Sequence, residues 1–207
     1  MAVWVKFSRP IFTTDFAELE VPHLFIHAWI AIVGVALLSW LLIALSALDA
    51  ELFWLPDKLT IPGIGLGFIY TVSMNRTAWF FDNTVSLTRA AEQCGIAILG
   101  TAGLVLIIRL AYWLIRRREG MGLGDAKLMA MLGAWLGLVG ALESFALAVL
   151  AASAAALIWL VLSALRRKTQ EWAKMPLPLG TFICLAALSE IFYPEWLWTW
   201  YSRTFLP

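Results

Sequence analysis

Long apolar runs, interrupted only by short polar or charged stretches, constrain this chain more than any other feature of its sequence. Of its 207 residues, 62% are hydrophobic and only 14% are charged, whereas soluble domains average about 45–50% apolar and about 25% charged residues. A run of roughly 20 apolar residues is long enough to cross the hydrocarbon core of a bilayer as a helix. The sequence therefore predicts an all-α, polytopic membrane protein.

Six runs are long enough to be counted as spans, if a span that ends in a protein-lined cavity is allowed to be short. We expect transmembrane helices near residues 25–48, 59–73, 91–115, 126–142, 145–165 and 177–193. The chain then divides into an N-terminal extracytoplasmic segment at residues 1–24, a six-helix membrane core at 25–193 and an aromatic interfacial tail at 194–207. No cleavable signal peptide is expected, because the first 26 residues are charged and lack an early apolar core.

Basic residues gather in the loops on one side of the expected helices. These residues are Lys58, Arg116, Arg117, Arg118, Arg166, Arg167, Lys168 and Lys174. Because loops rich in Lys and Arg stay in the cytoplasm, this side is predicted to be cytoplasmic. Both termini then lie outside, where Trp196, Trp198 and Trp200 of the tail are typical of an interfacial belt.

Charge and cysteine content exclude other classes. The net charge of +1 argues against a nucleic-acid partner, which requires a basic patch. Cys94 and Cys184 have no metal-ligand spacing, so we expect two reduced thiols and neither a metal nor another cofactor.

Carboxylates at membrane depth are costly, so each is a candidate functional residue. Most of them fall near the outer ends of expected helices, where we interpret them as solvated interface charges: Asp82, Glu92, Glu143, Glu190 and Glu195. Asp49 and Asp125 differ, because one ends the first expected helix and the other begins the fourth, both at the cytoplasmic boundary. Two such carboxylates can hydrolyse a peptide without a metal, one as a general base on water and the other, protonated, as the group that polarises the carbonyl.

The residues around Asp125 allow two interpretations. Gly120, Gly122 and Gly124 leave a strip of backbone without side chains that an extended substrate can approach closely. The stretch is equally consistent with an ordinary turn in which Asp125 caps a helix. Lys127 can pair with a nearby carboxylate or extend to lipid headgroups, and the sequence does not decide between them.

Three ordered blocks resemble the type IV prepilin peptidases, a family of GxGD aspartic proteases. Residues 120–128 with 133–137 contain the GxGD signature, residues 49–62 are similar to the first active-site segment, and residues 174–180 are similar to the start of the last helix. The resemblance implies that Asp49 and Asp125 are catalytic, and that the substrate is the short basic leader of a type IV prepilin or pseudopilin. Glu51 and Asp57 occupy polar positions of the motif and are expected to support the site, as are Lys127 and the three glycines.

The chain also departs from the pattern. Leu179 and Thr181 stand where the family usually has Phe and Pro, which indicates a specialised member serving one pilus, secretion system or conjugative element. Full-length members of the family often carry a cytoplasmic region with two zinc-binding CxxC pairs, which is linked to N-methylation of the new N-terminus. No CxxC pair is present here, so we expect leader cleavage without that region and without N-methylation. The oligomeric state is left open.

Two other functions remain compatible with the sequence. One is another GxGD protease, of the preflagellin or presenilin type, acting on a different helix. The other is a small proton-coupled transporter or assembly subunit, which would place its acids near the middle of the membrane rather than at one edge.

Overall fold

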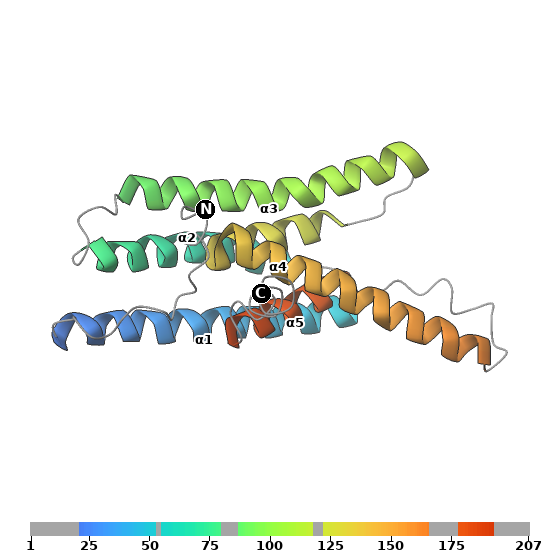
Figure 1. The fold of residues 1–207 in the computed structure, drawn as a ribbon, viewed down its shortest axis with the longest axis horizontal. Helices are drawn as coiled ribbons and strands as arrows, with labels where there is room; N and C mark the ends of the chain where they lie inside the picture. The colour runs from blue at the N-terminus through green and yellow to red at the C-terminus, as the bar shows by residue number, and fades with distance from the viewer. Residues whose placement is uncertain (1–20, 53–54, 80–86, 118–121, 166–177, 193–207) are drawn as a thin grey trace, which may run out of the picture.

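The structure is a bundle of helices that run back and forth along one direction (Figure 1). This computed structural model describes residues 21–52, 55–79, 87–117, 122–165 and 178–192. Within these ranges every element is helical: α1 (Val21–Leu52), α2 (Asp57–Trp79), α3 (Leu87–Arg116), α4 (Leu123–Leu165) and α5 (Leu179–Phe192). Of these helices, α1, α3 and α4 are long and apolar enough to cross a membrane. The predicted all-α fold of an integral membrane protein is confirmed, whereas the number of six spans stays a prediction.

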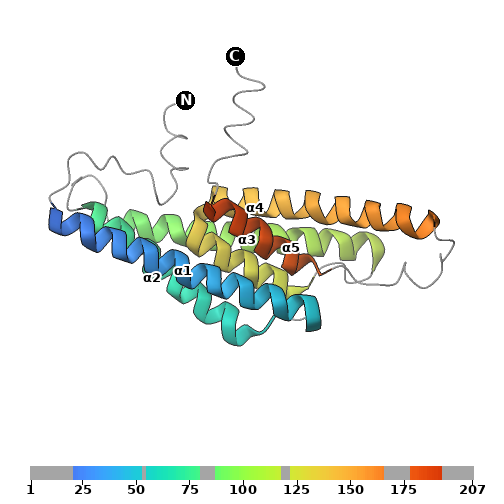
Figure 2. The ribbon, with the colours of Figure 1, turned by 90° about the horizontal axis from the view of Figure 1, so that it is seen from below.

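Helix α4 contains the fourth and fifth expected helices, and the boundary that we predicted between them was wrong. We placed it near residues 143–144, but the helical conformation breaks at Gly137, where φ is 74° and ψ is −179°. This backbone conformation is nearly restricted to glycine. Figures 1 and 2 both show that the chain reverses direction within α4, so we call residues 123–136 its first arm and residues 138–165 its second arm.

The first arm of α4 occupies the centre of the bundle. Eight of its side chains are at most 6% exposed: Ala126, Leu128, Met129, Ala130, Met131, Leu132, Ala134 and Trp135. At a rise of about 1.5 Å per residue the arm extends only about 20 Å, which is less than the hydrocarbon thickness of about 30 Å. Because protein rather than lipid surrounds it, the arm can end inside the membrane region without exposing its backbone to lipid.

Glycines on α2 allow the first arm to pack closely. A Cβ atom at Gly63 would lie 2.5 Å from Sδ of Met131, and one at Gly67 would lie 2.5 Å from Cδ1 of Trp135. The indole N–H of Trp135 donates a hydrogen bond of 2.9 Å to the carbonyl of Gly63, and its ring stacks on Tyr70. Small residues four positions apart permit this kind of close helix contact in membranes. Helix α2 therefore fixes the arm on which Asp125 lies.

The end of the first arm is held by side chains of two other helices. Ala134 lies in the last turn before the break at Gly137, where the carbonyls of a helix generally lack partners within it. The carbonyl oxygen of Ala134 accepts a hydrogen bond of 2.7 Å from the hydroxyl of Thr71 and a second one of 3.7 Å from the thiol of Cys94. Polar side chains of α2 and α3 thus provide hydrogen bonds to the backbone where the chain reverses.

Two further predictions, the end of α2 and the exposure of Glu190, were wrong. Helix α2 was predicted too short, at residues 59–73, because the helix continues to Trp79 through polar residues beyond the apolar run. Glu190 was predicted to be solvated, but it is buried at 8% exposure, where the second arm of α4 covers the end of α5 and a Cβ atom at Gly140 would lie 3.9 Å from its Cγ. Residues 1–20 of the predicted N-terminal segment, the aromatic tail at 194–207 and the basic loop at 166–174 lie outside the described residues. Residues 21–24 of that segment instead form the start of α1.

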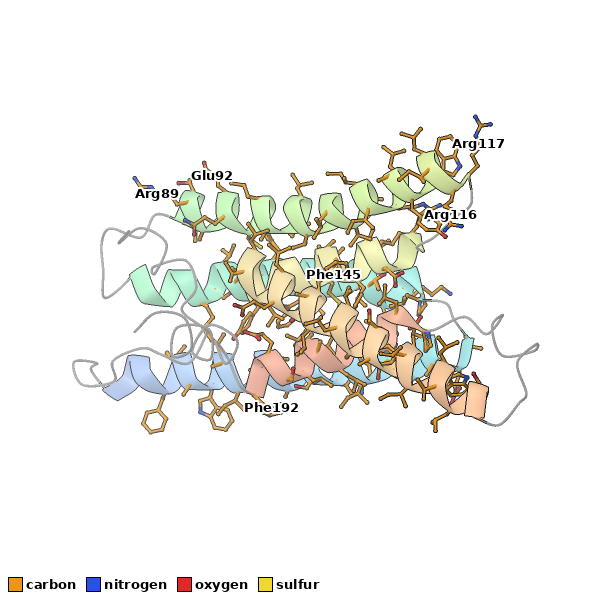
Figure 3. All side chains as sticks on the ribbon, turned by 45° about the vertical axis from the view of Figure 1, so that its right-hand side comes forward. Arg89, Glu92, Arg116, Arg117, Phe145 and Phe192 are labelled. Carbon is orange, nitrogen blue, oxygen red and sulfur yellow. The ribbon has the colours of Figure 1, made fainter. Side chains whose placement is uncertain are left out.

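The two ends of α3 differ in charge. Figure 3 shows Arg89 and Glu92 at one end of α3 and Arg116 and Arg117 at the other. Helix α1 ends, and α2, α4 and α5 begin, at the end where Arg116 lies (Figures 1 and 2). Residues that are far apart in the sequence therefore meet at this end.

Candidate active site

Asp49 and Asp125 meet where α1 ends and α4 begins. Asp49 lies in the last turn of α1 and is 5% exposed, and Asp125 lies in the first turn of α4 and is 9% exposed. The two carboxylates are close enough to interact electrostatically. The structure thus brings together the two acids that the sequence singled out.

Two glycines lie beside the carboxylates, in the first turns of α4 and α5. A Cβ atom at Gly180, near the start of α5, would lie 2.8 Å from Oδ2 of Asp49 and 3.1 Å from Cδ1 of Leu55. A Cβ atom at Gly124 would lie 3.2 Å from both Cβ and Cδ1 of Leu55. Leu55 therefore packs between the first turns of α4 and α5. A Cβ atom at Gly180 would collide with Asp49, and one at Gly124 would press against Leu55.

Thr181 binds Asp49 from the first turn of α5. Its backbone N–H donates a hydrogen bond of 2.7 Å to Oδ2 of Asp49, and its hydroxyl lies 3.1 Å from the same oxygen. A backbone N–H in the first turn of a helix has no partner within that helix, so it is available to a carboxylate. Sequence reasoning noted Thr181 only as a departure from a motif. Its position at the expected start of the last helix indicated an N–H without a partner in that helix, but not which residue would accept from it.

Asp125 is held by its own helix. The backbone N–H of Gly122 donates a hydrogen bond of 3.3 Å to Oδ2 of Asp125. This is half of a capping box, in which an acidic residue in the first turn reaches back to the residue before the helix. The bond uses one oxygen, so a capping role and a chemical role for Asp125 are compatible.

The remaining predicted residues are more exposed. Nζ of Lys127 lies 2.6 Å from Oδ1 of Asp57, and this ion pair joins the first turns of α2 and α4. Of the two arrangements that the sequence left open for Lys127, the structure has the pair with a carboxylate. Glu51 is exposed on α1, and within the described residues no ion pair involves it. Gly122 is exposed, and Gly120 lies outside the described residues.

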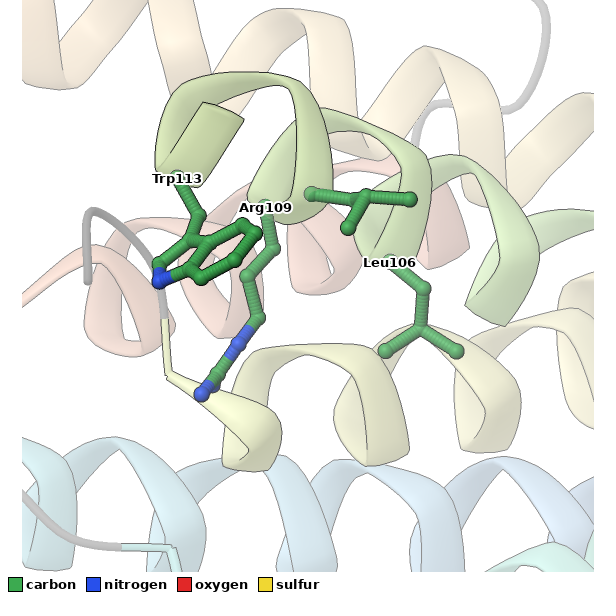
Figure 4. A pocket seen from close by; sticks show the side chains of 4 residues that line it. Leu106, Arg109 and Trp113 are labelled. Atoms are coloured by element: carbon green, nitrogen blue, oxygen red, sulfur yellow. The ribbon is translucent and has the colours of Figure 1, made fainter. Parts of the chain in front are cut away.

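Elsewhere in the described residues we looked for a metal site and for a pocket with reactive side chains. No group of three His, Cys, Asp or Glu side chains in the described ranges is arranged to hold a metal ion. A pocket on α3 is lined by Leu106, Arg109, Leu110 and Trp113 (Figure 4). It contains no nucleophile or acid, so the carboxylate pair is the stronger candidate for chemistry.

Comparison with known proteins finds a family whose match covers more than half of the chain. Residues 36–161 match the Type IV leader peptidase family, and this range contains Asp49, Asp57 and Asp125. The chain belongs to the type IV leader peptidase family. The resemblance inferred from the three sequence blocks is therefore confirmed.

Relatives within the type IV leader peptidase family are similar over most of this chain. The chain is 31% identical over 174 residues to a prepilin leader peptidase/N-methyltransferase of Aeromonas hydrophila, an alignment that covers 82% of this chain and 52% of the relative. A protein of the same name from Xanthomonas campestris is 31% identical over 173 residues, with 82% and 53% covered. The chain thus spans about half the length of these relatives. No solved structure matches it.

Proposed function

We propose that this chain is a membrane aspartic endopeptidase that removes the short basic leader of type IV prepilins or pseudopilins. The observation that carries the proposal is the pair of buried carboxylates, Asp49 and Asp125, brought together from α1 and α4. Membership of the family supports the choice of substrate. The proposal is limited to leader cleavage.

The chemistry requires the two carboxylates to share one proton. The ionised carboxylate accepts a proton from water as the water oxygen bonds to the scissile carbonyl carbon, and the protonated one donates to the carbonyl oxygen. The C–N bond then breaks, and the amine nitrogen takes the proton that came from water. Within the described residues, neither Asp49 nor Asp125 has a hydrogen bond to Oδ1, so each has one oxygen available for this work.

We place the site at the cytoplasmic side of a bacterial inner membrane. Support comes from the basic residues Lys58, Arg116 and Arg117, which lie at the end of the bundle where the carboxylates meet. The positive-inside rule assigns such an end to the cytoplasm. The apolar helix of a prepilin can then stay in the membrane while its leader reaches the carboxylates.

The proposal is tested by replacing Asp49 or Asp125 with Asn in cells that express a prepilin. Each replacement is expected to leave the leader uncleaved, because an amide can neither take up the proton of water nor share one with its neighbour. Mass spectrometry of the pilin measures the result. Glu92→Gln, which removes an exposed carboxylate at the other end of α3, is the matched control and should cleave normally. Normal leader removal by either Asp variant would overturn the assignment.

A further inference from the structure

The two carboxylates of the proposed site are held unequally. Oδ2 of Asp49 accepts from both donors of Thr181, whereas Oδ2 of Asp125 accepts only from the N–H of Gly122, at 3.3 Å. Both side chains are buried to a similar degree, so burial does not distinguish them. Hydrogen bonds donated to a carboxylate stabilise its negative charge, and the distance of 2.7 Å from the N–H of Thr181 is typical of a charge-assisted bond. Asp49 is the better held as an anion.

From this asymmetry we infer that Asp49 is the general base, that its Oδ1 is the atom that takes the proton, and that Thr181 is the residue that positions it. This inference rests on the proposed function. Because the N–H of Thr181 can only donate, Oδ2 has to remain an acceptor throughout the reaction. The proton of the attacking water therefore moves to Oδ1, and from there to the amine nitrogen when the C–N bond breaks. Asp125 gives its proton to the carbonyl oxygen and recovers it when the carbonyl of the product forms.

A second acceptor near the Thr181 hydroxyl is consistent with Thr181 as the residue that positions Asp49. The hydroxyl carries one hydrogen, and two acceptors lie within reach: Oδ2 of Asp49 at 3.1 Å and the backbone carbonyl of Ser46 at 3.2 Å. The charged oxygen is the stronger acceptor while Asp49 is ionised. Once Asp49 takes a proton, the hydroxyl can turn to Ser46. The hydroxyl thus keeps an acceptor in both protonation states, as a buried polar group requires.

The inference is tested with the purified full chain in detergent, acting on a prepilin, by comparing Thr181→Ser with Thr181→Val. Valine has the shape of threonine without its hydroxyl, whereas serine keeps the hydroxyl. Loss of one hydrogen bond to a charged group should lower kcat of Thr181→Val about tenfold while KM changes less than about twofold. Thr181→Ser should keep kcat within about threefold of wild type, because its hydroxyl can still donate to Asp49.

Thermal unfolding and gel filtration of each variant show whether it folds. If Thr181→Val does not fold, Thr181→Ala against Thr181→Ser repeats the hydroxyl comparison.

The outcomes distinguish this inference from the function on which it rests. Wild-type kcat in Thr181→Val, an equal loss in Thr181→Ser, or a rise in KM with kcat unchanged would each overturn the role of Thr181. In those cases cleavage by the wild-type chain would still support the proposed function. A wild-type chain that cleaves no prepilin leader would overturn the proposed function itself.

Discussion

At the scale of single residues, the proposed site depends on how two buried acids are held in a membrane protein. A buried carboxylate is costly unless nearby groups donate to it or neutralise it. Asp49 obtains its donors from α5, through a contact between residues 132 positions apart, whereas Asp125 obtains its donor from its own helix. The local bond of Asp125 could be predicted from sequence, since Asp is a common residue in the first turn. The bond of Asp49 could not, because only the packing of α5 against α1 creates it.

The ion pair between Asp57 and Lys127 leads to a prediction at this scale. Both side chains are exposed by more than a third, at 53% and 39%, and such pairs contribute only about 0–1 kcal/mol to stability. Asp57→Asn should therefore reduce the rate of leader cleavage by no more than about fivefold, the equivalent of about 1 kcal/mol. The rate is measured from the ratio of processed to unprocessed prepilin over time.

A double replacement checks that the pair acts as a pair. Exchanging the charges, with Asp57→Lys and Lys127→Asp together, should restore part of the rate that either single change loses. If Asp57→Asn abolished cleavage as completely as Asp49→Asn, Asp57 would have a direct role in the chemistry, contrary to the arrangement described above.

At the scale of helices, the sequence located the apolar runs but not all of their ends. We predicted a turn at Glu143 because this residue places a charge within a long apolar stretch. In the structure Glu143 lies inside the second arm of α4. The reversal occurs at Gly137, one of three glycines in that stretch, with Gly133 and Gly140 beside it. Hydropathy cannot tell which glycine adopts a positive φ. In the structure, Gly133 packs against α3, whereas a Cβ atom added at Gly137 would meet no atom of the described residues within 4 Å.

The packing of α2 on the first arm gives a prediction at the scale of helices. A methyl group added by Gly67→Ala would lie 2.5 Å from the ring of Trp135, whereas one added at Gly65 would meet no atom of the described residues within 4 Å. Gly67→Ala should lower the free energy of unfolding by about 1–3 kcal/mol, the usual cost of overpacking. Gly65→Ala, the matched control, should leave it unchanged or raise it slightly, because alanine is the better helix former.

Unfolding in detergent, followed by the fluorescence of the tryptophans, measures both variants. The first arm carries Asp125, so Gly67→Ala should also slow leader cleavage more than Gly65→Ala does. Equal stability of the two variants would contradict the close contact between α2 and α4.

At the scale of the whole molecule, short helices lie inside and long ones outside. The first arm of α4 is buried, whereas α3 and the second arm of α4 expose many large apolar side chains, among them Leu99, Leu114, Ile115, Leu150, Leu157 and Leu160. In water such surfaces would promote aggregation; in a bilayer they contact lipid. The carboxylates lie where two short helices, the first arm and α5, begin. This is how a polar site can be enclosed by a protein whose outer surface is apolar.

The orientation of this bundle in the membrane is the last prediction. Arg89 and Arg117 are exposed at opposite ends of α3 (Figure 3), and Cys94 and Cys184 are buried, so the native thiols should react little with a polar reagent. In spheroplasts, a membrane-impermeant maleimide should label Arg89→Cys at once, but label Arg117→Cys only after the membrane is disrupted. The reverse pattern would place the end that carries Asp49 and Asp125 outside the cytoplasm. Cleavage of a leader on the cytoplasmic side would then be impossible, even if both carboxylates proved essential.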